Sequence, residues 1–134
     1  MAEFNFEDEK KSGFKLVPQG EQVLTVENVE YQKVLGRVVV FLKNTDGIKM
    51  RHTFFLKKNN GEINNVAQNI WLNFGRNVLN KPQGSKGGFD TKDLIGHSVV
   101  ATVEHTESND GTTYANLKAW TFKPFVVDED LDNL

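Results

Sequence analysis

Residues 37–57 read Arg37-Val38-Val39-Val40-Phe41-Leu42-Lys43-Asn44-Thr45-Asp46-Gly47-Ile48-Lys49-Met50-Arg51-His52-Thr53-Phe54-Phe55-Leu56-Lys57. Two runs rich in β-branched and aromatic residues, 37–43 and 48–57, flank a short turn-like segment that ends in Asp46-Gly47. Asp-Gly between two such runs is a strong hairpin signal, because glycine accepts the positive φ that tight hairpin turns require. The two runs are therefore predicted to form an antiparallel pair of strands.

Further strands are predicted before and after this hairpin. Residues 21–31 are rich in β-branched and aromatic residues and lie between turn-like sequences, as strands do. Residues 97–106 and 113–122 have the same character. The segment Ser108-Asn109-Asp110-Gly111 between them predicts a second hairpin, which Pro124 ends.

Residues 62–79 carry a helical period instead. Apolar residues recur there at the spacing of one helix face: Ile63, Val66, Ala67, Ile70, Trp71, Phe74 and Val78. This face is predicted to cap the core. Residues 80–92 contain three glycines and a proline without a sustained period, which predicts an irregular loop that is either functional or disordered.

The predicted order is three strands, one helix and two strands within a chain of 134 residues, which is about the size of one domain. This is the order of the OB-fold, a five-stranded Greek-key barrel with one helix between strands 3 and 4 that is widely used to bind oligonucleotides and oligosaccharides. The predicted fold class is therefore mainly β, with the OB-fold domain at residues 14–125, an acidic flexible segment at 1–13 and an acidic tail at 126–134. A roll or a split β-sandwich with one covering helix is an alternative with the same order.

The net charge of −2 hides an uneven distribution of charge. Residues 1–9 and residues 126–134 each carry four acidic side chains and no basic one. The remaining residues, 10–125, carry 16 basic and 10 acidic side chains, a charge of +6. A basic body between two acidic ends favours a polyanion as partner.

Several classes of function find no support in the sequence. The absence of cysteine excludes disulfides, cysteine zinc sites and thiol nucleophiles. His52, His97 and His105 are too far apart in sequence for a local metal motif, and Gly84 to Gly88 lacks the order of a phosphate-binding loop. We expect no enzyme activity, metal or cofactor. No apolar run is long enough to span a membrane and the N-terminus is acidic, so a cytoplasmic location is expected.

Strand alternation separates a core side from an outer side. In residues 37–43 the predicted core set is Val38, Val40 and Leu42. In residues 48–57 it is Ile48, Met50, Phe54 and Leu56, with His52 as a misfit. In residues 113–122, Lys118 stands midway between Tyr114 and Trp120, and lysine is almost never fully buried without a partner. The side that carries these three residues is therefore expected to face water.

The outer sets combine aromatic and basic residues over three strands. Exposed rings stack on bases, and lysine and arginine follow the phosphates, as in proteins that bind single-stranded nucleic acid. The predicted stacking residues are Phe41, Phe55, Tyr114 and Trp120. The predicted phosphate-binding residues are Arg37, Lys43, Lys49, Arg51, Lys57 and Lys118. The alternative is a second buried face, covered by the helix, the N-terminal segment or a partner subunit.

The last nine residues combine acids with hydrophobic residues. One interpretation is a solubilising terminus. The other is a peptide that binds partner proteins or competes with nucleic acid for the basic face. Its predicted contact residues are Asp128, Glu129, Asp130, Leu131, Asp132 and Leu134.

Two stretches resemble the small phage-type single-stranded-DNA-binding proteins: Phe14-Lys15-Leu16-Val17-Pro18-Gln19-Gly20-Glu21, and Asp93-Leu94-Ile95-Gly96-His97-Ser98-Val99-Val100-Ala101-Thr102-Val103-Glu104-His105 with the hairpin that follows. The resemblance covers roughly residues 14–122, and the acidic tail is similar in kind. It implies an OB-fold that coats exposed single strands in DNA replication or recombination, inside the bacterial host cell, with little sequence preference. It also implies that the tail recruits replication or recombination proteins, although this tail ends in Asp-Asn-Leu where the bacterial pattern ends in Pro-Phe.

Two other functions suit the same aromatic and basic face. One is the binding of single-stranded RNA, because stacking on rings does not read the 2′-hydroxyl. The other is an oligomeric or adaptor module in which the face is an interface with a protein, including a second copy of this chain.

Overall fold

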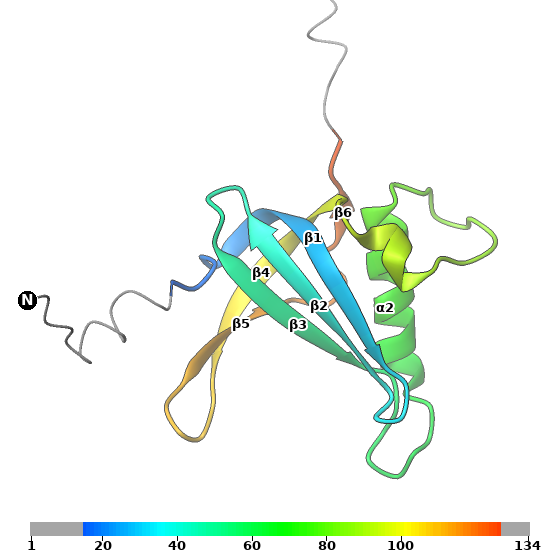
Figure 1. Ribbon diagram of the computed structural model, residues 1–134, viewed down its shortest axis with the longest axis horizontal. Helices are drawn as coiled ribbons and strands as arrows, with labels where there is room; N and C mark the ends of the chain where they lie inside the picture. Colours follow the sequence, from blue (N-terminus) through cyan, green and yellow to red (C-terminus); the bar gives the residue numbers. More distant parts are fainter. Residues whose placement is uncertain (1–14, 127–134) are drawn as a thin grey trace, which may run out of the picture.

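A computed structural model describes residues 15–126 of the chain (Figure 1). The predicted acidic N-terminal segment and, apart from Val126, the predicted tail lie outside these residues. The elements are, in chain order, β1 (Gly20–Gln32), β2 (Arg37–Asn44), β3 (Lys49–Phe55), α2 (Asn65–Val78), the short 3₁₀ helix η1 (Thr91–Leu94), β4 (Ser98–Glu107), β5 (Thr113–Leu117) and β6 (Lys123–Pro124). Neither of these helices is long and apolar enough to cross a membrane.

The strands form one antiparallel sheet in the order β3-β2-β1-β4-β5, and the short β6 pairs with β4. β1 lies at the centre, with its first half paired to β4 and its second half to β2. A bulge between Val26 and Asn28 interrupts the β1–β2 register. Within residues 15–126 no backbone ladder joins the edge strands β3 and β5. For the described residues, a mainly β fold with one α-helix is thus confirmed, as an unclosed sheet.

The hairpin of β2 and β3 forms at the predicted turn. Asn44 is buried, and its side-chain oxygen accepts hydrogen bonds from the backbone N–H of Asp46 (3.0 Å) and of Ile48 (2.9 Å). Gly47 has a φ of 81°, the left-handed conformation for which glycine is needed. The turn is therefore held by one buried asparagine and one glycine.

The second hairpin is shorter than predicted. The expected strand 113–122 ends at Leu117, and the backbone N–H of Lys118 then bonds the carbonyl of Thr102 at 2.8 Å as the chain turns. Trp120 lies in this turn with a φ of 63°. The strand alternation used to place Lys118 and Trp120 beside Tyr114 therefore stops before it reaches them.

The core lies between one side of the sheet and α2. The predicted core residues Val38, Val40, Leu42, Met50 and Phe54 are buried, as are Trp71, Phe74 and Val78 of the helix. Phe54 packs on both helix rings, with ring centroids 5.2 Å apart in each pair. The predicted helix face is wrong at its start, because Ile63 precedes the helix and is exposed together with Val66. Asn64 caps the helix instead, accepting from Ala67 N–H at 3.2 Å.

The loop predicted at residues 80–92 is irregular up to Asp90. Asp90 then caps η1, accepting a bond from Lys92 N–H, while the Asp93 carboxylate accepts from Asp90 N–H at 2.8 Å. This reciprocal arrangement is a capping box. The helix η1, whose Leu94 is fully buried, was not predicted from the sequence.

Candidate nucleic-acid interface

The β2–β3 ladder brings six of the predicted contact residues onto one side of the sheet. Residues directly opposite each other in an antiparallel pair point to the same side. The ladder pairs Arg37 with Phe55, Phe41 with Arg51 and Lys43 with Lys49. All six therefore lie on the side away from the buried set Val38, Val40 and Leu42.

A hollow of about 250 Å³ lies between β3 and β5 on this side. Three residues of each strand line it: Arg51, Thr53 and Phe55, with Tyr114, Ala115 and Asn116. Phe55 and Tyr114 are 56% and 49% exposed, so both residues are open to solvent. The predicted face of β3 and the predicted ring of β5 thus share one hollow.

A second hollow, of about 350 Å³, shares Phe55 with the first. It lies between the β1–β2 turn and the segment after β3, and is lined by Val34, Leu35, Arg37, Phe55, Lys57, Lys58, Asn59 and Gly61. Arg37 donates from Nε to the side-chain oxygen of Gln32, which orients its guanidinium. Among the described residues, the lining of both hollows includes cationic side chains and no carboxylate. We call the two hollows together the β3 groove.

His52 bridges the two strands behind the first hollow. Its Nδ1 accepts a hydrogen bond from the backbone N–H of Leu117 at 3.2 Å, and its ring meets Phe54 edge to face at 4.8 Å. Burial lowers the pKa of His52 to about 4, because the charged imidazolium would lose its hydration. The imidazole is therefore neutral at pH 7 and Nδ1 can act as an acceptor. His52, which did not fit the predicted apolar core, thus forms a polar link between β3 and β5.

Not every predicted contact residue lies at the β3 groove. Lys43 and Lys49 pair with the single carboxylate of Glu27, at 3.8 and 4.0 Å. Phe41 is half-buried opposite Arg51 and lines neither hollow. Lys118 and Trp120 are exposed in the turn after β5 and also line neither. The predicted contacts of the tail, Asp128 to Leu134, lie outside the described residues.

Several residues of the β3 groove were not predicted from the sequence. Thr53 and Asn116 bear no charge or ring, so nothing in their type marked them. Val34 and Leu35 were detectable, because an aliphatic pair in a short turn is unusual where polar residues and glycine dominate. Val34 and Leu35 are 95% and 60% exposed.

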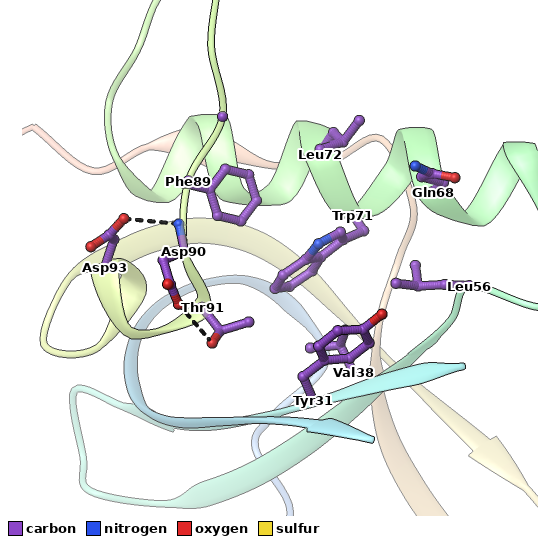
Figure 2. Close-up of a pocket in the computed structure, with 11 residues that line it drawn as sticks. Tyr31, Val38, Leu56, Gln68, Trp71, Leu72, Phe89, Asp90, Thr91 and Asp93 are labelled. Atoms are coloured by element: carbon purple, nitrogen blue, oxygen red, sulfur yellow. Dashed lines mark hydrogen bonds between the residues drawn. The ribbon is translucent and has the colours of Figure 1, made fainter. Parts of the chain in front are cut away.

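A separate cavity of about 700 Å³ lies between α2, the adjoining ends of β1 and β2, and residues 88–93 (Figure 2). Figure 2 shows Trp71, Phe89 and Tyr31 around it, with Asp90 and Asp93 at one end. Carboxylates repel phosphate, and Tyr31 turns toward this cavity rather than toward the β3 groove. We therefore do not include the cavity in the candidate nucleic-acid interface.

Within residues 15–126, no three His, Asp or Glu side chains gather as metal ligands would. No protein-family model matches the chain, and no curated protein is significantly similar to it. The geometry of the β3 groove therefore carries the functional inference.

Proposed function

We propose that this protein binds single-stranded DNA through the β3 groove, with little sequence preference. The observation that carries the proposal is the exposed ring of Phe55, which stands between two hollows with cationic linings. A base stacked on such a ring contributes about 1–3 kcal/mol, irrespective of its identity. Tyr114 offers a second ring in the first hollow, while Arg37, Arg51, Lys57 and Lys58 are placed to contact phosphates.

The proposal includes an OB-type barrel as the fold. Its support is the strand order, which makes β3 and β5 the two edges, together with the His52–Leu117 bond between those edges. The helix between β3 and β4 has the OB position as well. OB-folds bind oligonucleotides on the face of strands 2 and 3 and with the loop between strands 1 and 2. The β3 groove includes part of that face and, through Val34 and Leu35, part of that loop.

In this role the protein coats single strands exposed during DNA replication or recombination, as its resemblance to phage-type proteins implies, and it catalyses no reaction. The basic balance of residues 10–125 suits such a partner despite the overall charge of −2. Binding of single-stranded RNA by the same rings is an outcome that the test below separates.

Fluorescence anisotropy of a labelled deoxythymidine oligomer tests the proposal on the full chain. Phe55→Ala should weaken binding by about 5- to 150-fold, the equivalent of one lost base stack of 1–3 kcal/mol. Phe125→Ala is the matched control, because Phe125 is also exposed and lines neither hollow. A duplex of the same length should bind more weakly, because its bases are already stacked and paired. A uridine oligomer that binds more tightly than the deoxythymidine oligomer would instead support binding of single-stranded RNA. Equal losses of affinity in Phe55→Ala and Phe125→Ala, or no binding of the oligomer by the parent protein at low salt, would contradict the proposal.

A protein interface is the second candidate, and Val34 and Leu35 are the observation that favours it. An aliphatic pair so exposed is typical of a surface that another protein covers. An apolar interface is far less sensitive to salt than phosphate contacts. Self-association that persists at high salt and is abolished by Leu35→Ser would support this second function.

A further inference from the structure

A third hollow, of about 170 Å³, lies against the C-terminal half of α2. Three apolar side chains line it, Leu72, Leu79 and Phe89, together with three cationic ones, Arg76, Lys81 and Lys86. We call it the α2 hollow. It shares no lining residue with the β3 groove, and residues 81–88 form its other wall.

The α2 hollow has a fixed floor. Figure 2 shows Phe89 beside the helix, near Leu72 and Trp71. Its ring centroid lies 5.5 Å from that of Trp71, and a Cβ at Gly75 would overlap the ring. The start of the loop is tied to the helix in both directions: Lys81 N–H donates to the Arg76 carbonyl at 2.9 Å, and Arg76 Nη1 donates to the Lys81 carbonyl at 3.0 Å. The Arg76 guanidinium and the backbone of Lys81 therefore have defined positions beside the apolar floor.

The cations that line the α2 hollow have no carboxylate partner in the described part of the chain. The ion pairs formed within residues 15–126 involve Lys43, Lys49 and Lys123 only. The lining of the hollow contains no acidic side chain among those residues. An occupant of complementary chemistry carries several carboxylates and at least one aliphatic side chain.

Residues 127–134 have that chemistry. Their sequence, Val127-Asp128-Glu129-Asp130-Leu131-Asp132-Asn133-Leu134, contains four acidic, three aliphatic and no basic side chains. It is the part of this chain in which acids and leucines alternate most closely, and it follows directly from the last described residue.

The tail also begins within reach of the α2 hollow. Phe122 packs on Phe74 of α2 with ring centroids 5.1 Å apart, and β6 follows at Lys123–Pro124. Figure 1 shows β6 beside the end of α2 from which the loop continues. Eight extended residues span about 26 Å. The whole of α2, with 14 residues, is about 21 Å long.

We propose that residues 127–134 dock in the α2 hollow of their own chain. Leu131 lies on the floor of Leu72, Leu79 and Phe89, and the flanking acids pair with Arg76, Lys81 and Lys86. Docking holds the acidic tail away from the β3 groove and leaves that groove open. A partner protein must then compete with the α2 hollow to bind the tail. The proposal does not depend on what the β3 groove binds.

A nitroxide label at Asn133→Cys tests the proposal on the full chain, which has no other cysteine. In the ¹⁵N-labelled protein, signal loss is expected at the amides of residues 72–89. Leu131→Ser and Lys86→Glu should each abolish the localised loss. Lys92→Glu is the matched control and should preserve it, because Lys92 is exposed in the same connection but does not line the hollow.

Three outcomes would overturn the proposal. The first is signal loss at Phe55 and Tyr114, which would mean that the tail covers the β3 groove. The second is an absence of localised loss. The third comes from a mixture in which some copies carry ¹⁵N and the others carry the nitroxide. Signal loss in the ¹⁵N-labelled copies of this mixture would place the tail on a second molecule. Binding of the deoxythymidine oligomer, measured on the same variants, tests the proposed function separately.

Discussion

Trp120 combines exposure with a strained backbone. Its φ of 63° puts a bulky residue in the left-handed region, which roughly costs an L-residue 1–2 kcal/mol. The turn is imposed by its neighbours, since Thr121 Oγ1 donates to the Lys118 carbonyl at 2.6 Å and accepts from Thr102 N–H at 3.1 Å. Strain retained at an exposed ring is the kind of outlier that motivates a functional hypothesis.

Trp120→Gly should therefore separate stability from binding. Glycine adopts this φ without strain, so the thermal midpoint should stay the same or rise. If Trp120 stacks on a base as predicted, affinity for the deoxythymidine oligomer should fall by the equivalent of about 1–3 kcal/mol. Asn80→Gly is the control, because Asn80 also has a positive φ of 54° but bears no ring. Unchanged affinity in Trp120→Gly would restrict the bound strand to the β3 groove.

His52 should make stability depend on pH. The folded protein holds the pKa of His52 at about 4, against an ordinary value of 6.5. Between these values the unfolded chain binds a proton that the folded chain does not, so the free energy of unfolding falls as pH falls. The loss is complete near pH 4 and amounts to about 3 kcal/mol at 1.36 kcal/mol per pH unit.

Urea denaturation at pH 7.5, 5.5 and 4.5 measures this dependence. His52→Asn keeps a hydrogen-bond acceptor for Leu117 N–H but cannot be protonated in this range. The variant should therefore lose less stability than the parent on acidification. Parallel curves for the two proteins would show that His52 is not the titrating group.

Helix α2 and the loop after it meet at a glycine that was not singled out in the sequence. Gly75 lies inside the helix, where alanine is ordinarily preferred by about 1 kcal/mol. A Cβ there would overlap the ring of Phe89, so Gly75→Ala should lower the free energy of unfolding despite the better helix propensity. In the Phe89→Ala background the same change should stabilise. Additive effects of the two substitutions in urea denaturation would contradict this contact.

At the scale of elements, the sequence predicts what is local. The β2–β3 hairpin follows from Asp46-Gly47 between two strand-like runs, and α2 follows from its period. The end of β5 was not predictable in this way, because the alternation continues past Leu117 while the backbone turns. Alternation also predicts Arg51 and Phe55 on one side of β3. Alternation does not indicate which strand lies next to that side. The hollow that β3 shares with Tyr114 and Asn116 could therefore be found only in the structure.

At the scale of the whole molecule, the distribution of charge matters more than its sum. The β3 groove holds four cations, Arg37, Arg51, Lys57 and Lys58, while Glu27 occupies Lys43 and Lys49 at the other end of the same face. The sequence predicts five of these six cations as equivalent phosphate contacts; the sixth, Lys58, was not predicted. Glu27 lies at the bulge of β1, where its carboxylate pairs with the two lysines. No pattern in the sequence predicts this bulge.

Salt titrations of oligomer binding distinguish these two sets of cations. Each phosphate contact lowers log affinity by about 0.7 per unit of log salt on single strands. Arg51→Gln should remove one contact and reduce the slope by about that amount, whereas Lys43→Gln should change it less because Lys43 is paired with Glu27. Glu27→Gln should steepen the slope and tighten binding at low salt, since it releases Lys43 and Lys49 to meet a strand that runs along the whole β2–β3 face. An unchanged slope in Glu27→Gln would end the bound strand at Arg51 and leave the two lysines with a purely structural role.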